Sequence, residues 1–128
     1  MDKKKALIVD DEKVIRKIIK VTLQQLGYES IEAVDGADSI EKALEHNPHI
    51  IIMDIMMPKM DGIEATLRIK NDSRTKHIPI IMLTAVLDSQ AVLQSYDYGA
   101  DHYLNKPFTR EQLSKAIKII EKMKAREL

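Results

Sequence analysis

One apolar run near the middle of the chain constrains the fold more than any other segment. Residues 50–54 read Ile-Ile-Ile-Met-Asp, so that a single carboxylate, Asp54, closes the run. A short β-branched run bounded by turn-forming residues is typical of a strand buried on both faces, as in a parallel sheet. The carboxylate at its end needs a cation or hydrogen bonds, because desolvation penalises the charge.

Short apolar runs alternate with amphipathic segments along the whole chain. The runs predict strands, and the segments between them predict helices with one buried face. The predicted strands are 6–9, 28–34, 50–54, 79–84 and 100–105. The predicted helices are 12–26, 37–46, 63–70, 88–98 and 109–128.

Alternation with short loops predicts right-handed strand–helix–strand units and an α/β fold. We expect a doubly wound five-stranded parallel sheet in the order 2-1-3-4-5, the flavodoxin-like order, with five helices over its two faces. In that order the first and third strands are neighbours. The last predicted helix runs to the end of the chain, so we expect residues 1–128 to form a single domain.

Several apolar positions define the expected buried faces of the helices. They are Ile15, Ile18, Ile19, Leu23 and Leu26 in the first helix, Ala37, Ile40 and Leu44 in the second, and Leu113, Ile117, Ile120 and Met123 in the last. The segment Thr109 to Gln112 has the spacing of a capping box, which predicts where the last helix begins.

The charge balance and the lack of cysteine exclude several kinds of function. Lys plus Arg and Asp plus Glu number 20 each, giving a formal net charge of zero. This balance argues against broad electrostatic binding to nucleic acid or anionic membrane. The absence of cysteine excludes disulfides and thiolate metal sites. No apolar segment reaches the length of a signal peptide core or a membrane span, so we expect a soluble cytoplasmic domain.

Polar residues stand where the predicted strands end. Asp10 and Asp11 follow the first strand, Asp54 ends the third, Thr84 ends the fourth and Lys106 follows the fifth. Parallel strands end at one edge of the sheet, so these side chains are expected to converge. Three ionised carboxylates need a cation, and all-oxygen ligands favour Mg²⁺ over Ca²⁺. A metal-bound carboxylate beside a lysine and a threonine suits phosphoryl transfer with an aspartate nucleophile.

These residues belong to a wider pattern that covers essentially the whole chain. It consists of Asp10-Asp11, Asp54, Met57-Pro58, Asp61-Gly62, Thr84-Ala85, Tyr103 and Lys106-Pro107-Phe108. The pattern resembles the receiver domain of two-component response regulators, the CheY-like phosphoacceptor module of histidine–aspartate phosphorelays.

The resemblance implies a chemical role for the acidic residues. Asp54 is expected to take a phosphoryl group from a sensor histidine kinase or a histidine phosphotransferase. Asp10, Asp11, Asp54 and the backbone carbonyl of Met56 are expected to bind Mg²⁺. The chain is then no enzyme in the usual sense, because it catalyses only its own phosphorylation and dephosphorylation.

The resemblance also implies a switch. Lys106 is expected to pair with Asp54 and then with the phosphoryl group, while Thr84 moves to hydrogen-bond that group and Tyr103 turns inward. The Lys106-Pro107 peptide bond is expected to be cis. The switched surface is formed by the fourth helix, fifth strand and fifth helix, and we expect Val92 and Tyr96 to lie there with Tyr103. A downstream protein or output domain would read it, without direct nucleic-acid or membrane contact.

Apolar residues near the acceptor suggest further hypotheses. Met56 and Val86 lie two residues after Asp54 and Thr84, and neither can orient an attacking water by a strong hydrogen bond. We therefore expect slow hydrolysis of phosphorylated Asp54. Val14 and Val21 lie off the buried stripe of the first helix, where they form either a contact patch for the phosphodonor or peripheral core.

Other readings of the same residues remain open at this point. A magnesium-dependent phosphatase of the haloacid-dehalogenase kind also forms an aspartyl phosphate, but it needs a second aspartate where this chain has Met56. A receiver-fold scaffold that is never phosphorylated is disfavoured, because every expected site residue is present. A nucleotide-binding module lacks its glycine-rich phosphate loop here. Asp10-Asp11 alone would fit a helix N-terminal acid pair, and Tyr103 alone would fit plain packing.

Overall fold

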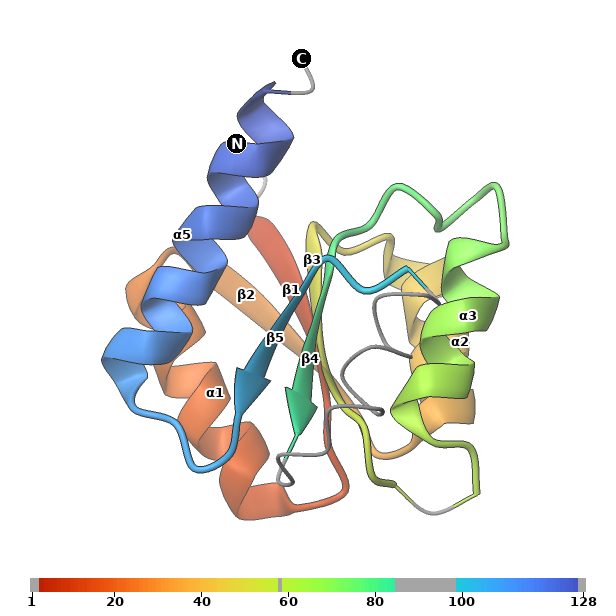
Figure 1. Cartoon of the computed structure of the whole chain (residues 1–128), viewed down its shortest axis with the longest axis horizontal. Helices are drawn as coiled ribbons and strands as arrows, with labels where there is room; N and C mark the ends of the chain where they lie inside the picture. The colour runs from red at the N-terminus through yellow and green to blue at the C-terminus, as the bar shows by residue number, and fades with distance from the viewer. Residues whose placement is uncertain (1–2, 58, 85–98, 127–128) are drawn as a thin grey trace.

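The computed structural model describes residues 3–57, 59–84 and 99–126, which form one parallel sheet with helices on both faces (Figure 1). The strands are β1 (Lys4–Val9), β2 (Tyr28–Ala33), β3 (Ile50–Asp54), β4 (Ile80–Thr84) and β5 (His102–Asn105). The helices are α1 (Lys13–Gln25), α2 (Gly36–His46), α3 (Gly62–Lys70) and α5 (Arg110–Arg126). The predicted strand order is confirmed as β2-β1-β3-β4-β5. The helix predicted over 88–98, with Val86, Val92 and Tyr96, lies outside the described residues.

The sheet divides the core into two apolar clusters. Helices α1 and α5 cover one face and α2 and α3 cover the other, as Figure 1 shows. Successive residues of a strand point to opposite faces, so Ile50 and Ile52 join the α1–α5 cluster while Ile51 and Met53 join the α2–α3 cluster. All five residues of β3 are buried, which confirms the prediction of a strand covered on both faces. Within the described part of the chain, no helix is long and apolar enough to cross a membrane.

Helix α1 buries a narrower apolar face than its spacing predicts. Ile19 and Leu23 are buried as expected, but Ile18 is 41% exposed, so its predicted burial is wrong. Thr22 takes a buried place instead, and its hydroxyl donates to the carbonyl of Ile18. Because the buried hydroxyl of Thr22 is hydrogen-bonded, a threonine can occupy the buried face of α1 without leaving a polar group unsatisfied.

Helix α2 packs through small residues, so its predicted apolar face is largely wrong. Ala37 and Leu44 are exposed and Ile40 is half-buried; the buried positions are Gly36, Ser39 and Ala43. Small side chains allow a close approach of the backbone to its neighbours. A Cβ atom on Gly36 would lie 2.5 Å from the carbonyl oxygen of Met60.

Helix α5 begins at the predicted capping box. The Gln112 amide donates to Thr109 Oγ1 at 3.1 Å, and the Thr109 amide donates to Gln112 Oε1 at 2.9 Å. Leu113, Ile117 and Ile120 are buried as expected. Met123 is exposed, contrary to the prediction, because the last turns of α5 extend past the sheet (Figure 1).

Candidate functional site

The carboxyl edge of the sheet brings Asp10 and Asp54 to one lysine. Lys106 Nζ donates to Asp10 Oδ2 at 2.7 Å and lies 3.3 Å from Asp54 Oδ2. Asp10 is fully buried and Asp54 is 4% exposed. A third carboxylate, on Glu12, has its Oε1 atom 4.0 Å from the same ammonium. One cation therefore serves two buried acids, which leaves the site with excess negative charge.

Burial and the excess negative charge make Asp54 a weaker acid than an ordinary aspartate. Burial, and after it the neighbouring charge of Asp10, raise the pKa of Asp54 from 3.8 to about 6. Lys106 and the Met56 amide oppose this rise without cancelling it. Burial alone would lower the pKa of Lys106, but its bonds and ion pairs with Asp10 and Asp54 outweigh burial and raise it. An additional cation would relieve the excess charge.

The donor set beside Lys106 fits a hard divalent cation. Carboxylate oxygens of Asp10, Asp11 and Glu12 lie within 4.8 Å of one another. The Glu12 amide donates to Asp10 Oδ1 at 2.8 Å and so orients that carboxylate. Carboxylate oxygens with access to water are the donors that Mg²⁺ prefers, and Asp11 and Glu12 are exposed. Asp54 lies outside this group but adjoins it, because its carboxylate and that of Asp10 both pair with Lys106.

The site includes two residues, Glu12 and Arg16, that the sequence pattern does not predict. Glu12 is the N-cap residue of α1, and its position directly after Asp10-Asp11 was the available signal. Arg16 Nη1 donates to the backbone carbonyl of Asp10 at 2.6 Å, while its Nε donates to Glu32 Oε1 at 3.0 Å. Arg16 thereby ties the turn after β1 to β2. No sequence motif marks it, since the contact depends on the pairing of β1 with β2.

Met56 adjoins the acceptor through its backbone. Its amide donates to Asp54 Oδ1 at 3.3 Å. The residue is 65% exposed and borders a shallow depression whose walls include Asp11 and Asp61. The thioether therefore stands at the open side of the site, next to the acidic group.

The loop after Met56 is held against the end of β3. Asp61 caps α3 by accepting from the Glu64 amide at 2.9 Å, and the Gly62 amide donates to the carbonyl of Ile55 at 2.9 Å. Gly62 packs so closely that a Cβ atom there would lie 2.1 Å from the backbone oxygen of Asp54. The start of α3 therefore fixes the backbone that carries Asp54.

Thr84 and Tyr103 lie on the same face of the sheet. Thr84 follows Met82 at the alternate position of β4, and Met82 pairs in register with Tyr103 of β5. Both Met82 and Tyr103 pack in the α2–α3 cluster. Thr84 is buried and Tyr103 is half-buried. The Lys106-Pro107 bond is cis, as predicted.

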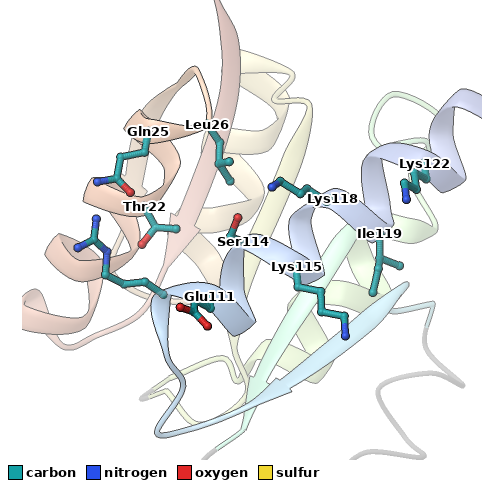
Figure 2. Close-up of a pocket in the computed structure, with 10 residues that line it drawn as sticks. Thr22, Gln25, Leu26, Glu111, Ser114, Lys115, Lys118, Ile119 and Lys122 are labelled. Carbon is teal, nitrogen blue, oxygen red and sulfur yellow. The ribbon is translucent and has the colours of Figure 1, made fainter.

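Two further depressions are lined mainly by residues of α1 and α5. One is lined on α5 by Lys115, Lys118 and Lys122 and at the end of α1 by Gln25 and the following residue, Leu26 (Figure 2). The other is lined by Val14, Lys17, Ile18, Val21 and Arg110. Neither contains a predicted acceptor or metal-binding residue, so both are candidate surfaces for protein contacts.

Comparison with known proteins gives consistent matches. The model of the response regulator receiver domain matches residues 6–118. Protein PilG of Pseudomonas aeruginosa is 40% identical over 114 residues, which cover 89% of this chain and 84% of PilG. The DNA-binding dual master transcriptional regulator RpaA of Synechocystis sp. is also 40% identical, over 84% of this chain. The chain spans only 44% of the length of RpaA.

Solved structures of similar proteins agree with the sheet topology. Chemotaxis protein CheY4 of Vibrio cholerae has a TM-score of 0.86 and 36% identity, covering 91% of this chain and 98% of that one. A CheY-like receiver domain protein of Methanospirillum hungatei has a TM-score of 0.91 and 27% identity, covering 99% of this chain and all of that one.

Proposed function

The chain belongs to the response-regulator receiver family of phosphorelay signalling proteins, and we propose that Asp54 is its phosphoryl acceptor. The observation that carries the proposal is the pair of buried carboxylates, Asp10 and Asp54, on the single ammonium of Lys106. Asp54 is the member of this pair that lies in the sheet and outside the acidic group of Asp10, Asp11 and Glu12.

The side chains suggest how acceptance would proceed. Asp54, with a pKa of about 6, is mostly ionised at neutral pH and remains more basic than an ordinary aspartate, which favours attack on phosphorus. An oxygen of Asp54 forms the new bond as the bond from phosphorus to the donor's imidazole nitrogen breaks. The Lys106 ammonium, already 3.3 Å from Asp54 Oδ2, neutralises charge on the transferred group.

The acidic group has a separate role in this proposal. Asp10, Asp11, Asp54 and the backbone carbonyl of Met56 would hold Mg²⁺, which when bound supplies charge neutralisation at the phosphoryl oxygens. Glu12 adds a further carboxylate beside Asp10 and Asp11. The Glu12 amide orients the Asp10 carboxylate, as described above.

Treatment with acetyl phosphate tests the proposal. In Mg²⁺ the wild type is expected to gain one phosphate-sized mass, mapped to the peptide with Asp54, and to gain none in a chelator. Asp54→Asn is expected to gain none. Asp38→Asn makes the same change on α2, outside the acidic group, and is expected to keep the adduct. A wild type without the adduct, or an adduct that persists in Asp54→Asn, contradicts the assignment.

We propose that phosphorylation is read through the shared face of β4 and β5. The Thr84 hydroxyl would hydrogen-bond the phosphoryl group, and Tyr103 would turn inward beside Met82, its register partner. Tyr103 packs in the α2–α3 cluster and Thr84 lies on the same face of the sheet, so a shift at one would change the space available to the other. A downstream protein or output domain would bind the surface that includes β5 and α5.

The exposed valines support a site for the phosphodonor on α1. Val14 is 68% exposed and Val21 40% exposed, and both line one depression with Ile18. We propose that the histidine kinase or phosphotransferase docks there. The predicted peripheral packing of Val14 does not account for so large an exposed fraction.

The balanced formal charge of the chain supports a domain that does not itself contact nucleic acid.

Replacement of Met56 by asparagine is expected to shorten the lifetime of phosphorylated Asp54. An amide can orient the attacking water, whereas a thioether is a weak hydrogen-bond acceptor. One added hydrogen bond in the transition state corresponds to about fivefold faster hydrolysis. Loss of the phosphate-sized mass with time measures the rate, with Met56→Leu as the apolar control. Equal rates in Met56→Asn and the wild type would show that Met56 does not limit hydrolysis.

A further inference from the structure

Met56 differs from the other described methionines in how much of the residue is exposed to solvent. It is 65% exposed, whereas Met53 and Met82 are fully buried and Met57 and Met60 are half-buried. Met123 is 41% exposed but belongs to the last turns of α5, beyond the sheet. Met56 is therefore the most exposed of the described methionines, and it is the residue whose amide bonds the acceptor carboxylate.

We propose that Met56 is an oxidation site, and that its conversion to methionine sulfoxide shortens the lifetime of phosphorylated Asp54. The inference rests on the proposed function of Asp54. On this proposal the site around Asp54 responds to two reagents, the phosphodonor and a peroxide that oxidises Met56. The modification would convert the apolar border of the acceptor into a polar one without changing the sequence.

The oxidation step needs no residue other than Met56. A sulfur lone pair attacks one oxygen of a peroxide, the O–O bond breaks, and a sulfur–oxygen bond forms. The sulfur loses two electrons. The second peroxide oxygen leaves as water from hydrogen peroxide, carrying both protons, or as an alcohol from an organic hydroperoxide, carrying its organic group and the one proton. Exposure of the thioether allows the peroxide to approach, while the sulfurs of Met53 and Met82 are shielded by the core.

Geometry links this modification to the phosphoryl group. Met56 follows Asp54 by two residues, and its amide is fixed at 3.3 Å from Asp54 Oδ1. Its side chain borders the depression that also contains Asp11, a member of the acidic group. A sulfoxide oxygen is a much stronger hydrogen-bond acceptor than a thioether. It would orient a water near the acyl phosphate, so hydrolysis is expected to be about fivefold faster, the equivalent of one hydrogen bond.

Two single variants separate the effect of Met56 from that of Met123, the other exposed methionine among the described residues. Met123→Leu keeps Met56 as the exposed thioether, and Met56→Leu keeps Met123. Both are treated with the same dose of hydrogen peroxide, quenched, and mapped for sulfoxide by peptide mass. Each is then phosphorylated with acetyl phosphate in Mg²⁺, and the adduct is followed after the donor is removed.

The expected result is sulfoxide at Met56 and about fivefold faster loss of phosphate in oxidised Met123→Leu, with no acceleration in oxidised Met56→Leu. Treatment with both methionine sulfoxide reductases is expected to restore the slow decay. Oxidation of other methionines before Met56, or unchanged decay once Met56 is oxidised, overturns the inference. Untreated protein that never forms the adduct contradicts the proposed function as well, so the two failures are distinguishable.

Discussion

Replacement of Asp54 by asparagine is expected to raise the free energy of unfolding by about 3 kcal/mol near pH 8 in a chelating buffer. The cause is the buried position of this carboxylate beside Asp10, which raises its pKa from 3.8 to about 6. The folded protein therefore holds the Asp54 proton more tightly than the unfolded chain does. Asparagine keeps nearly the same shape and removes the charge.

The sign of the effect follows from this raised pKa. The stability that protonated Asp54 contributes is fully present below pH 3.8, and it is lost as the pH rises through about 6. Asparagine does not titrate, so its advantage over the wild type should be near zero at low pH and largest above the folded-state pKa. Bound Mg²⁺ should reduce the advantage by stabilising the wild type.

Urea titrations of both proteins near pH 4 and pH 8, followed by circular dichroism, measure this difference. Asp11→Asn is the matched control, because it removes an exposed carboxylate of the same acidic group. Its effect is expected to stay within about 0.5 kcal/mol at either pH. An Asp54→Asn advantage that is equal at the two pH values, or absent at both, would contradict the electrostatic account of the site.

Replacement of Gly62 by alanine is expected to destabilise the protein by about 3 kcal/mol or more. The added Cβ atom would lie 2.1 Å from the carbonyl oxygen of Asp54 and 2.9 Å from its carbonyl carbon. Both contacts are with backbone, so no side chain can rotate to make room. Either α3 or the end of β3 must move, and the second movement displaces Asp54. We therefore expect a lower rate of phosphorylation in the fraction that folds.

Gly27→Ala is the control for the glycine prediction. Gly27 has a φ of +87°, but a Cβ atom there would meet nothing within 4 Å. Its replacement should cost only the strain of the left-handed backbone, about 1 kcal/mol, and should leave phosphorylation unchanged. Thermal and urea unfolding of the two variants give the comparison. If Gly62→Ala is no more destabilised than Gly27→Ala, contact with Asp54 is not what requires glycine at position 62.

The sequence alone was enough to predict the strand order of the sheet and the convergence of Asp10, Asp54 and Lys106 at one edge of it. Uninterrupted apolar runs such as 50–54 identify doubly buried strands, and parallel strands must end at one edge. Asp10, Asp54 and Lys106 could therefore be placed together without a structure. Their individual roles remain proposals, because proximity does not show which carboxylate reacts.

The helix faces were less predictable, since burial there depends on partners distant in sequence. The sequence predicts that Leu44 is buried in the core, but α2 approaches the loop at Met60 very closely. Only small residues such as Gly36 and Ser39 fit on that side of the helix, so they form its buried face. Arg16 was missed for a related reason. Its contacts with Asp10 and Glu32 join the ends of β1 and β2, and they exist only once those strands are paired.

The bond from Lys106 to Asp10 joins residues 96 positions apart in the chain. When translation has passed only the first three strands, the chain already contains Asp10 and Asp54. Lys106, the residue that pairs with both, has not yet been synthesised. Nascent or truncated chains of that length lack the lysine that pairs with Asp54. If Asp54 is the acceptor, as proposed, a chain that stops before Lys106 contains both carboxylates without the ammonium that pairs with them, and we expect it not to accept a phosphoryl group.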